Sequence, residues 1–208
     1  MTIASLLPAL LLLAMPPAEP PRGAPSKPED LRMAHDYAQC IAKANPGQAA
    51  RILKLDYRTD SYRRSLGNLA GTPHLCASFD GRLKMAGVLV AGSFAEALLP
   101  RALAGRALED AVAVDPSKAP LAARDDGEYL GLCAVRTMPG QVAALLATVP
   151  ASEAEKSAAA AIAPGLSPCL RVGAAAKINR PALRALLALA AYRIVSEAGP
   201  GAARAGKV

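Results

Sequence analysis

The sequence is poor in aromatic residues. It has no Trp, two Phe and five Tyr among 208 residues, although 52% of its residues are hydrophobic. The apolar content is mainly Ala and Leu, which are strong helix formers and can be buried by close packing of helices. Few side chains remain that stack on bases, sugars or flavins, so the composition disfavours a nucleic-acid-binding protein.

Motifs of common enzymes are also missing. The chain contains no G-x-S-x-G, S-x-x-K, H-E-x-x-H, P-loop or C-x-x-C pattern. A Ser/His/Asp set assembles from distant positions, so the absence of motifs does not exclude catalysis. We nevertheless expect a non-enzymatic protein without a cofactor.

The N-terminus carries an apolar run, Ile3–Ala14, that is too short to span a bilayer. Its length suits a signal peptide, although no Lys or Arg precedes it and no clean cleavage site follows. A buried helix or a membrane anchor are the alternatives. We expect a signal peptide at 1–18, a Pro-rich disordered spacer at 19–28 and export to the periplasm or the medium. No cysteine follows the run, which leaves a lipid anchor without support.

The chain resembles itself at a fixed offset. Residues 40–53 read CIAKANPGQAARIL and residues 133–146 read CAVRTMPGQVAALL, 93 positions later. Similarity at one offset indicates two supersecondary units built alike. The pattern therefore predicts a tandem duplication.

The four cysteines form two equally spaced pairs, each 36 residues apart: Cys40 with Cys76, and Cys133 with Cys169. An even number of cysteines in an exported chain favours disulfides, whereas zinc ligands usually come in close pairs. Four cysteines allow three pairings. A repeated unit most simply closes its own bridge, which predicts Cys40–Cys76 and Cys133–Cys169.

We expect an all-α fold of two tandem helical units, about four helices each, packed together and each closed by one disulfide. The units cover residues 29–114 and 127–198, with a polar linker at 115–126 and a disordered basic tail at 199–208. Units of this size rarely bury enough surface alone, so a shared core is expected. Neither long apolar segment is a membrane span, because Glu96 and Arg184 interrupt them.

Local signals place the helix starts. Ser26 to Glu29 and Ser152 to Glu155 read as capping boxes. Asn45 and Asn179 read as N-caps followed by Pro, and Met138 stands where Asn45 does in the other unit. Thr59 or Asp60 would cap a third helix. Residues 82–92 fit a short strand or a helix, of which we favour the helix.

Both histidines lie in the first unit. If Cys40 and Cys76 are bridged, His35 and His74 approach each other with Asp36 nearby. Two imidazoles and a carboxylate suit a divalent metal or a hydrolase site. More often such histidines are solvated or bond to a helix end.

The first unit also carries a basic block: Arg51, Lys54, Arg58, Arg63 and Arg64. Positions 51, 54 and 58 are expected on one helical face, and Tyr57 and Tyr62 are interleaved. The corresponding positions of the second unit hold one cation, Lys156. Guanidinium groups favour phosphate and carboxylate, so the block predicts an anion-binding surface. A solvated face, partly neutralised by its own acidic residues, is the alternative.

The net charge is +7 and the isoelectric point is near 9.5. A basic exported protein is suited to anionic surfaces. The function expected from the sequence is non-catalytic binding or structural support in the cell envelope, with an anionic envelope component or a protein as partner. The alternative is a hydrolase or metal-dependent enzyme at His35, Asp36 and His74.

Overall fold

The computed structural model describes residues 27–70, 76, 87–113, 121–171 and 178–198. These residues contain α-helices and one short 3-10 helix but no strand, which confirms the all-α prediction. In chain order the helices are α1 (Pro28–Ala44), α2 (Pro46–Leu53), α3 (Asp60–Ala70), α4 (Gly87–Leu103), α5 (Leu108–Ala111), α6 (Asp126–Thr137), α7 (Pro139–Leu146), α8 (Glu153–Ile162), the 3-10 helix η1 (Ala163–Cys169) and α9 (Arg180–Ala198).

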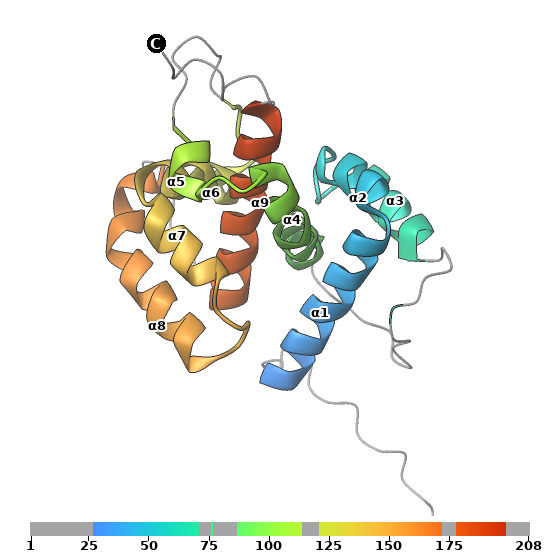
Figure 1. Ribbon diagram of the computed structural model, residues 1–208, viewed down its shortest axis with the longest axis horizontal. Coiled ribbons are helices and arrows are strands. Elements are labelled where there is room, and N and C mark those ends of the chain that lie inside the picture. Colours follow the sequence, from blue (N-terminus) through green and yellow to red (C-terminus); the bar gives the residue numbers. More distant parts are fainter. Residues whose placement is uncertain (1–26, 71–75, 77–86, 114–120, 172–177, 199–208) are drawn as a thin grey trace, which may run out of the picture.

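The two long apolar helices, α4 and α9, lie in the middle of the molecule (Figure 1). Helices α1, α2 and α3 lie to one side of this pair, and α6, α7 and α8 lie to the other. Helix α1 packs on α4, and α6 packs on α9. Among the described residues no helix is both long and apolar enough to cross a membrane.

The short helices α2 and α7 start in the same way. Each has Pro at its first position, where the missing N–H costs nothing. The residues before them share one backbone conformation, with φ −131° and ψ 58° at Asn45 and φ −137° and ψ 48° at Met138. The expected side-chain cap at Asn45 is wrong, because its amide group turns back toward the carbonyl of Ile41 in α1, 3.5 Å away.

Other expected caps are present. The Ser152 hydroxyl accepts from the N–H of Glu155, and the Asn179 carbonyl oxygen accepts from the N–H of Ala182, both at 3.0 Å. Thr59, rather than Asp60, accepts from the N–H of Tyr62. Of the ambiguous 82–92 segment, residues 87–92 are helical; residues 82–86 and Ser26 lie outside the described residues.

Helices α4 and α9 cross at Gly92 and Ala185. A Cβ atom added to Gly92 would lie 2.3 Å from the Cα of Ala185, far inside van der Waals contact. Only glycine at position 92 allows the two backbones to approach this closely. This contact sets the distance between the central helices and hence between the helices on either side.

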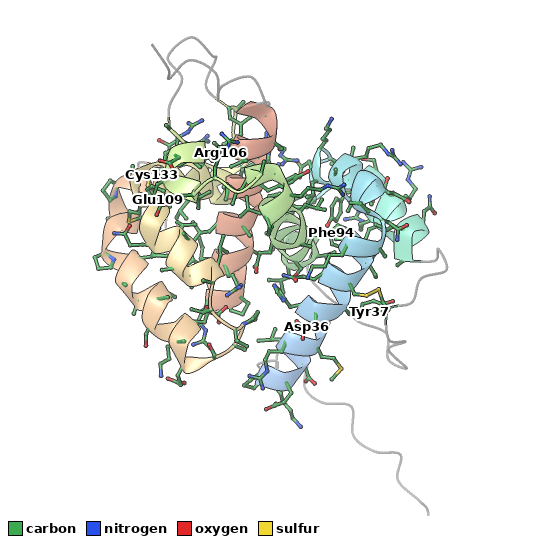
Figure 2. The ribbon with its side chains drawn as sticks, in the orientation of Figure 1. Asp36, Tyr37, Phe94, Arg106, Glu109 and Cys133 are labelled. Carbon is green, nitrogen blue, oxygen red and sulfur yellow. A yellow bond between two sulfur atoms is a disulfide. The ribbon has the colours of Figure 1, made fainter. Side chains whose placement is uncertain are left out.

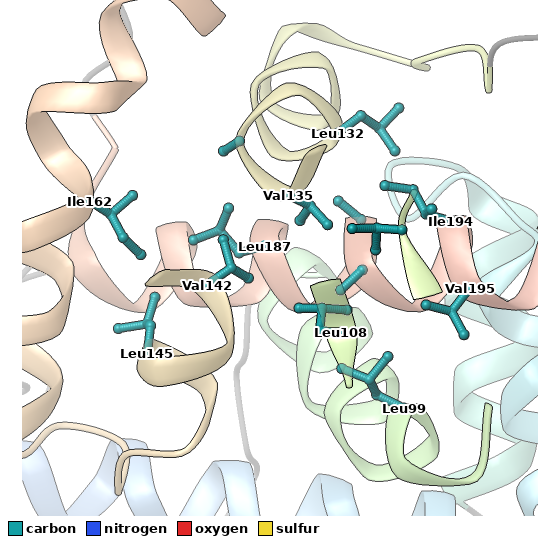
Figure 3. Packing of buried hydrophobic residues seen from close by; sticks show 14 of the residues in the cluster. Leu99, Leu108, Leu132, Val135, Val142, Leu145, Ile162, Leu187, Ile194 and Val195 are labelled. Carbon is teal, nitrogen blue, oxygen red and sulfur yellow. The ribbon is translucent and has the colours of Figure 1, made fainter. Parts of the chain in front are cut away.

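Two hydrophobic cores lie on the two sides of the central pair, and each takes residues from both halves of the chain. The core around α1 to α4 includes Phe94, on α4 (Figure 2), together with Ala188 and Leu189 of α9. The core around α6 to α9 includes Leu99 of α4 and Leu108 of α5, which lie beside each other (Figure 3). The cores are therefore joined through α4 and α9.

Both predicted disulfides are present. Cys40 in α1 is bonded to Cys76, and Cys133 in α6 is bonded to Cys169 at the end of η1. Each bridge closes a loop across 36 residues. Helix α5, which is not among the helices expected from the sequence, packs against α7.

Candidate functional site

Of the predicted metal or catalytic group, the structure describes Asp36 and His35, and His35 lies against α4. Its Nε2 lies 3.1 Å from Glu96 of α4, and its Nδ1 lies 3.6 Å from Asp36, whose side chain is mostly exposed. His74 lies outside the described residues. Within the described ranges no three His, Cys, Asp or Glu side chains are placed to hold a metal ion. The structure thus gives His35 a carboxylate partner that the sequence did not indicate.

A buried arginine, Arg184 of α9, is the centre of the junction between the two sides of the molecule. Its guanidinium donates two parallel hydrogen bonds of 2.8 Å to Glu96. It also donates to the carbonyls of Leu145 and Leu146 at the end of α7 and to the hydroxyl of Thr148. Bidentate guanidinium–carboxylate pairs are the strong, geometrically specific ion pairs of proteins. All donor groups of Arg184 are therefore used within the protein.

A second buried carboxylate, Glu155 of α8, completes this network. One of its oxygens lies 3.4 Å from Arg184, and the other accepts from the N–H of Ala151 at 3.0 Å. Arg180 approaches to 3.1 Å, within ion-pair distance, although its N–H is not aligned for a hydrogen bond. Two buried carboxylates thus share two arginines, so the charges are balanced in place.

The ionised state of Glu96 is stabilised by these neighbours. Burial alone would raise its pKa, but the hydrogen bonds from His35 and Arg184 outweigh burial and hold the pKa below its ordinary value. A carboxylate whose pKa is lowered in this way is a poor general acid or base near neutral pH. Glu96 is suited to holding the helices together.

A small pocket opens beside this network, lined by residues of α1, α4, α8 and α9 and of the turn before α8, including His35, Glu96 and Arg184. Its cavity volume is about 40 Å³, which is room for ordered water but not for a sugar or a nucleotide. Glu96 and Arg184 are bonded to each other and Ser93 donates to the carbonyl of Leu89, whereas the Nδ1 of His35 has no hydrogen-bond partner among the described residues. This pocket is consequently a weak candidate for substrate binding.

The sequence carried a signal for the junction. Glu96 and Arg184 are charges of opposite sign within the two long apolar segments of the sequence, where they also exclude a membrane span. Because buried charges are paired in proteins, an ion pair between Glu96 and Arg184 could have been predicted from the sequence. No feature of the sequence indicated that Glu155 and the carbonyls of α7 also bind Arg184.

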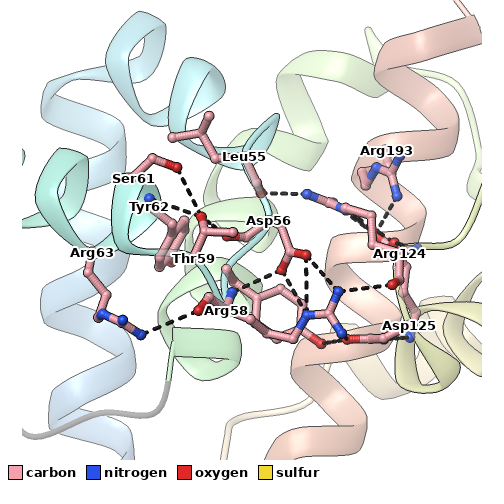
Figure 4. Close-up of polar contacts among 12 residues, drawn as sticks. Leu55, Asp56, Arg58, Thr59, Ser61, Tyr62, Arg63, Arg124, Asp125 and Arg193 are labelled. Atoms are coloured by element: carbon pink, nitrogen blue, oxygen red, sulfur yellow. Dashed lines mark hydrogen bonds and ion pairs between the residues drawn. The ribbon is translucent and has the colours of Figure 1, made fainter.

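A second polar network joins the α2–α3 turn to the start of α6 (Figure 4). Asp125 caps α6 by accepting from the N–H of Glu128, and it also accepts from the Tyr57 hydroxyl at 2.7 Å. Arg124 donates to the carbonyl of Leu55 and pairs with Glu128, which also pairs with Arg193. Residues 124 and 125 belong to the predicted linker, yet they bind both sides of the molecule.

The hydrogen-bond partners in this network determine the charge states of Glu128 and Tyr57. Burial would raise the pKa of Glu128, but hydrogen bonds from Arg124 and Arg193 hold it below the ordinary value. Burial and the hydrogen bond to Asp125 raise the pKa of Tyr57. The tyrosine therefore stays neutral and serves as a donor.

The five predicted anion-binding residues fall into two groups, and the first consists of arginines that are paired with acidic side chains. Helix α2 ends at Leu53, so Arg58 lies beyond the helix and not on its face as expected. Arg58 is bonded to Asp56 at 2.6 Å and approaches Asp125, and Arg63 is paired with Asp60. The hydrogen bonds from Arg58 lower the pKa of Asp56 to about 2. These two arginines are neutralised locally.

The other three predicted cations remain available. Arg51, Lys54 and Arg64 are exposed and have no ion-pair or hydrogen-bond partner among the described residues. The interleaved tyrosines are not displayed with them, because Tyr62 is buried with its hydroxyl donating to the carbonyl of Gly87 and Tyr57 bonds to Asp125. We call Arg51, Lys54 and Arg64 the basic surface.

An open groove adjoins the basic surface along α2. Its volume is about 250 Å³. Its walls are apolar apart from Arg101 and the phenol of Tyr192; the lining residues are Pro46, Gly47, Ala50, Leu98, Arg101, Ala102 and Tyr192. Arg51 and Lys54 follow Gly47 by four and seven residues, which places them on the same side of α2. We call this feature the α2 groove.

Comparison with known proteins provides no relative for the chain. No protein-family model, no curated protein and no solved structure matches it. Any function must therefore be inferred from the buried junction, the basic surface and the α2 groove.

Proposed function

We propose that residues 29–114 and 127–198 are two units of a tandem duplication. In support, Pro46 and Pro139 begin α2 and α7, Asp60 and Glu153 begin α3 and α8, and Gly87 and Arg180 begin α4 and α9, each pair 93 residues apart. The two disulfides have the same spacing. Gly92 and Ala185, which touch at the centre, are also 93 residues apart, as expected for units related by a twofold axis.

For this protein we propose a non-catalytic binding role in the cell envelope or outside the cell. Two disulfides in a small helical protein are typical of oxidising compartments. The signal peptide expected at 1–18 supports the same location, although residues 1–26 lie outside the described residues.

We propose that the partner is anionic and binds the basic surface. The observation that carries this proposal is the contrast among the five predicted cations. Two are neutralised by Asp56, Asp125 and Asp60, whereas Arg51, Lys54 and Arg64 are exposed and have no partner in the described part of the chain. Exposed, unpaired cations attract carboxylates or phosphates, and their effect weakens with salt.

The catalytic alternative at His35, Asp36 and His74 has less support. His35 faces Glu96, which is already bonded to Arg184, and Asp36 points to solvent (Figure 2). Metal analysis of the purified protein tests this alternative directly. A stoichiometric metal that is lost in His74→Ala would favour the enzyme over the binding protein.

Binding to two anionic probes tests the proposed role. Poly-glutamate and vesicles containing phosphatidylglycerol present carboxylate and phosphate, respectively. The triple variant Arg51→Gln/Lys54→Gln/Arg64→Gln is expected to bind the preferred probe at least tenfold more weakly at low salt, because three unpaired charges are removed. The smaller salt dependence of the variant should show the same loss.

A matched control removes three charges from the other unit. Arg136→Gln/Lys156→Gln/Arg171→Gln has the same net charge as the first variant. It should bind like the unmodified protein if the basic surface is the site. Equal weakening by both triple variants would mean that only net charge matters, and the proposal would be wrong.

A further inference from the structure

The starts of α2 and α7 differ in what covers them. A Cβ added to Gly140 in α7 would lie 3.2 Å from a carboxylate oxygen of Glu109, which belongs to α5. A Cβ added to Gly47, 93 residues earlier in α2, would have no atom within 4 Å. Helix α5, which belongs to residues 29–114, therefore covers this place in the second unit, whereas no described residue covers the corresponding place in the first unit.

Helix α5 is a small amphipathic cover for the second unit. Leu108, Ala111 and Val112 are buried in the core around α6 to α9, whereas Glu109 and Asp110 are exposed. Leu108 lies next to Leu99 of α4 (Figure 3). Its four residues thus combine an apolar inner side with an acidic outer side.

The α2 groove is the uncovered counterpart of the place that α5 fills. Its lining residues Gly47, Leu98 and Ala102 correspond, 93 positions on, to Gly140, Ala191 and Val195 of the second unit. Ala191 and Val195 belong to the core that α5 completes. The groove is therefore built from the same helix positions but has no cover among the described residues.

One position that lines the α2 groove is charged, whereas the corresponding position of the second unit is apolar. Arg101 lines the α2 groove and is exposed without a partner among the described residues, whereas the corresponding residue of the second unit, Ile194, is buried. Tyr192 also lines the groove, and its phenol has no hydrogen-bond partner in the part of the chain that the structure describes. With Arg51 and Lys54 on the same side of α2, the apolar floor is bordered by cations.

We propose that the α2 groove binds a short amphipathic helix of a partner protein, with apolar residues on its inner side and Glu or Asp on its outer side. The inference rests on the proposed function and specifies its partner. Two observations support it: α5 occupies the corresponding place in the second unit, and the cations around the groove complement acidic side chains. The bound segment would resemble α5 in pattern.

The tail of the chain is the competing occupant. Residues 199–208 follow α9 much as α5 follows α4, but they contain Arg204 and Lys207 and no acidic residue. Like charges at the groove would repel this segment. Charge complementarity therefore favours a segment from another protein.

A fluorescent synthetic peptide with the sequence of residues 104–115 is the probe. It contains the apolar and acidic residues of α5. Gly47→Trp places a large ring at the open groove, where nothing lies within 4 Å, and should weaken binding of the peptide at least tenfold. Gly67→Trp is the control, because Gly67 on α3 is equally open and exposed. It should bind like the unmodified protein.

A charge exchange identifies the contact with Arg101. Arg101→Glu should weaken binding of the same peptide at least tenfold. A peptide in which Lys replaces both acidic residues of the α5 sequence should then bind Arg101→Glu better than it binds the unmodified protein. Failure of this exchange would contradict the role of the cations around the groove.

Other outcomes would overturn the proposal in identifiable ways. Equal binding by Gly47→Trp and Gly67→Trp would place the peptide elsewhere, for example at α7 after displacement of α5. A tenfold gain in peptide binding after deletion of residues 199–208 would make the tail the occupant. If the peptide does not bind while the basic-surface variant still loses poly-glutamate or vesicle binding, the proposed function stands and this inference fails.

Discussion

Under the proposed duplication, one buried position carries different chemistry on the two sides of the molecule. Tyr62 in α3 and Glu155 in α8 are 93 residues apart, and both are almost fully buried. Tyr62 donates to the carbonyl of Gly87 at the start of α4. Glu155 instead approaches Arg180 at the start of α9, and it also binds Arg184. If the units are duplicated, the contact of α3 with α4 corresponds to the contact of α8 with α9, and its chemistry differs: a tyrosine hydroxyl donor in the first and an ion pair in the second.

This difference concentrates charge at the junction. A buried tyrosine contributes a large apolar area and needs one hydrogen-bond partner. The attraction within a buried ion pair is largely offset by the cost of removing both charges from water, so the pair adds little net stability. Removing one partner is nevertheless strongly destabilising, because it leaves the other charge buried and unpaired. The ion pairs around Arg184 are therefore expected to fix how α9 meets α4 and α8, and the aromatic side is expected to tolerate change better.

The largest effect is expected from Arg184→Met. Removing the guanidinium leaves Glu96 and Glu155 buried without their main partner, which should lower the free energy of unfolding by about 3–5 kcal/mol. Tyr62→Phe, at the aromatic side, removes one hydroxyl and should cost about 1 kcal/mol. Urea unfolding at pH 7 measures both. Similar losses in the two variants would show that the junction is no more sensitive than the aromatic side.

The disulfides should be equivalent. Each bridge closes a loop across 36 residues, so the chain-entropy model gives each about 4 kcal/mol. Cys40→Ala/Cys76→Ala and Cys133→Ala/Cys169→Ala are therefore expected to lose similar amounts in unfolding experiments. A difference above about 2 kcal/mol would mean that the two sides depend on their bridges to different degrees, and the comparison would need revision.

The third effect depends on pH. The pKa of Glu128 is lowered by Arg124 and Arg193, so its charge stabilises the fold above the unfolded-state pKa of about 4.3, and that contribution is lost as the pH falls. Glu128→Gln should cost about 2 kcal/mol at pH 7, and the difference from the unmodified protein should shrink below about pH 4. Glu153→Gln, which removes an exposed carboxylate, is the control and should cost far less than Glu128→Gln at pH 7.

The smallest effect separates the helix caps. Ser152→Ala removes an acceptor for the N–H of Glu155 and should cost about 1 kcal/mol. Asn45→Ala should cost only a few tenths of a kcal/mol, because the Asn45 side chain does not cap α2. Thermal unfolding of the two variants measures the difference. Equal losses would mean that Asn45 stabilises α2 in solution.

Much of the fold could be predicted from local sequence. Pro46 and Pro139 mark helix starts because proline fits the first turn, and Ser152 and Asn179 cap as expected. The equal cysteine spacing selected the observed pairing. These signals are readable because each depends on residues close together in the chain or on a repeated distance.

The polar contacts between the sides were harder to predict. Arg124 and Asp125 read as linker residues, yet they bind Leu55, Tyr57 and Arg58 across the molecule. Their partners lie about 70 residues away, and no local pattern specifies which acid meets which base. The neutralisation of Arg58 and the open α2 groove likewise depend on how distant helices pack.

Because the core around α1 to α4 includes residues of α9, it cannot be completed until the end of the chain has been synthesised. Ala188 and Leu189 of α9 complete the core around α1 to α4. A chain emerging from the ribosome or a translocation channel therefore holds α1 to α4 with one wall of their core missing until α9 arrives. Cys40 and Cys76 are both present long before that point, so their bridge is available to hold the early helices together during synthesis.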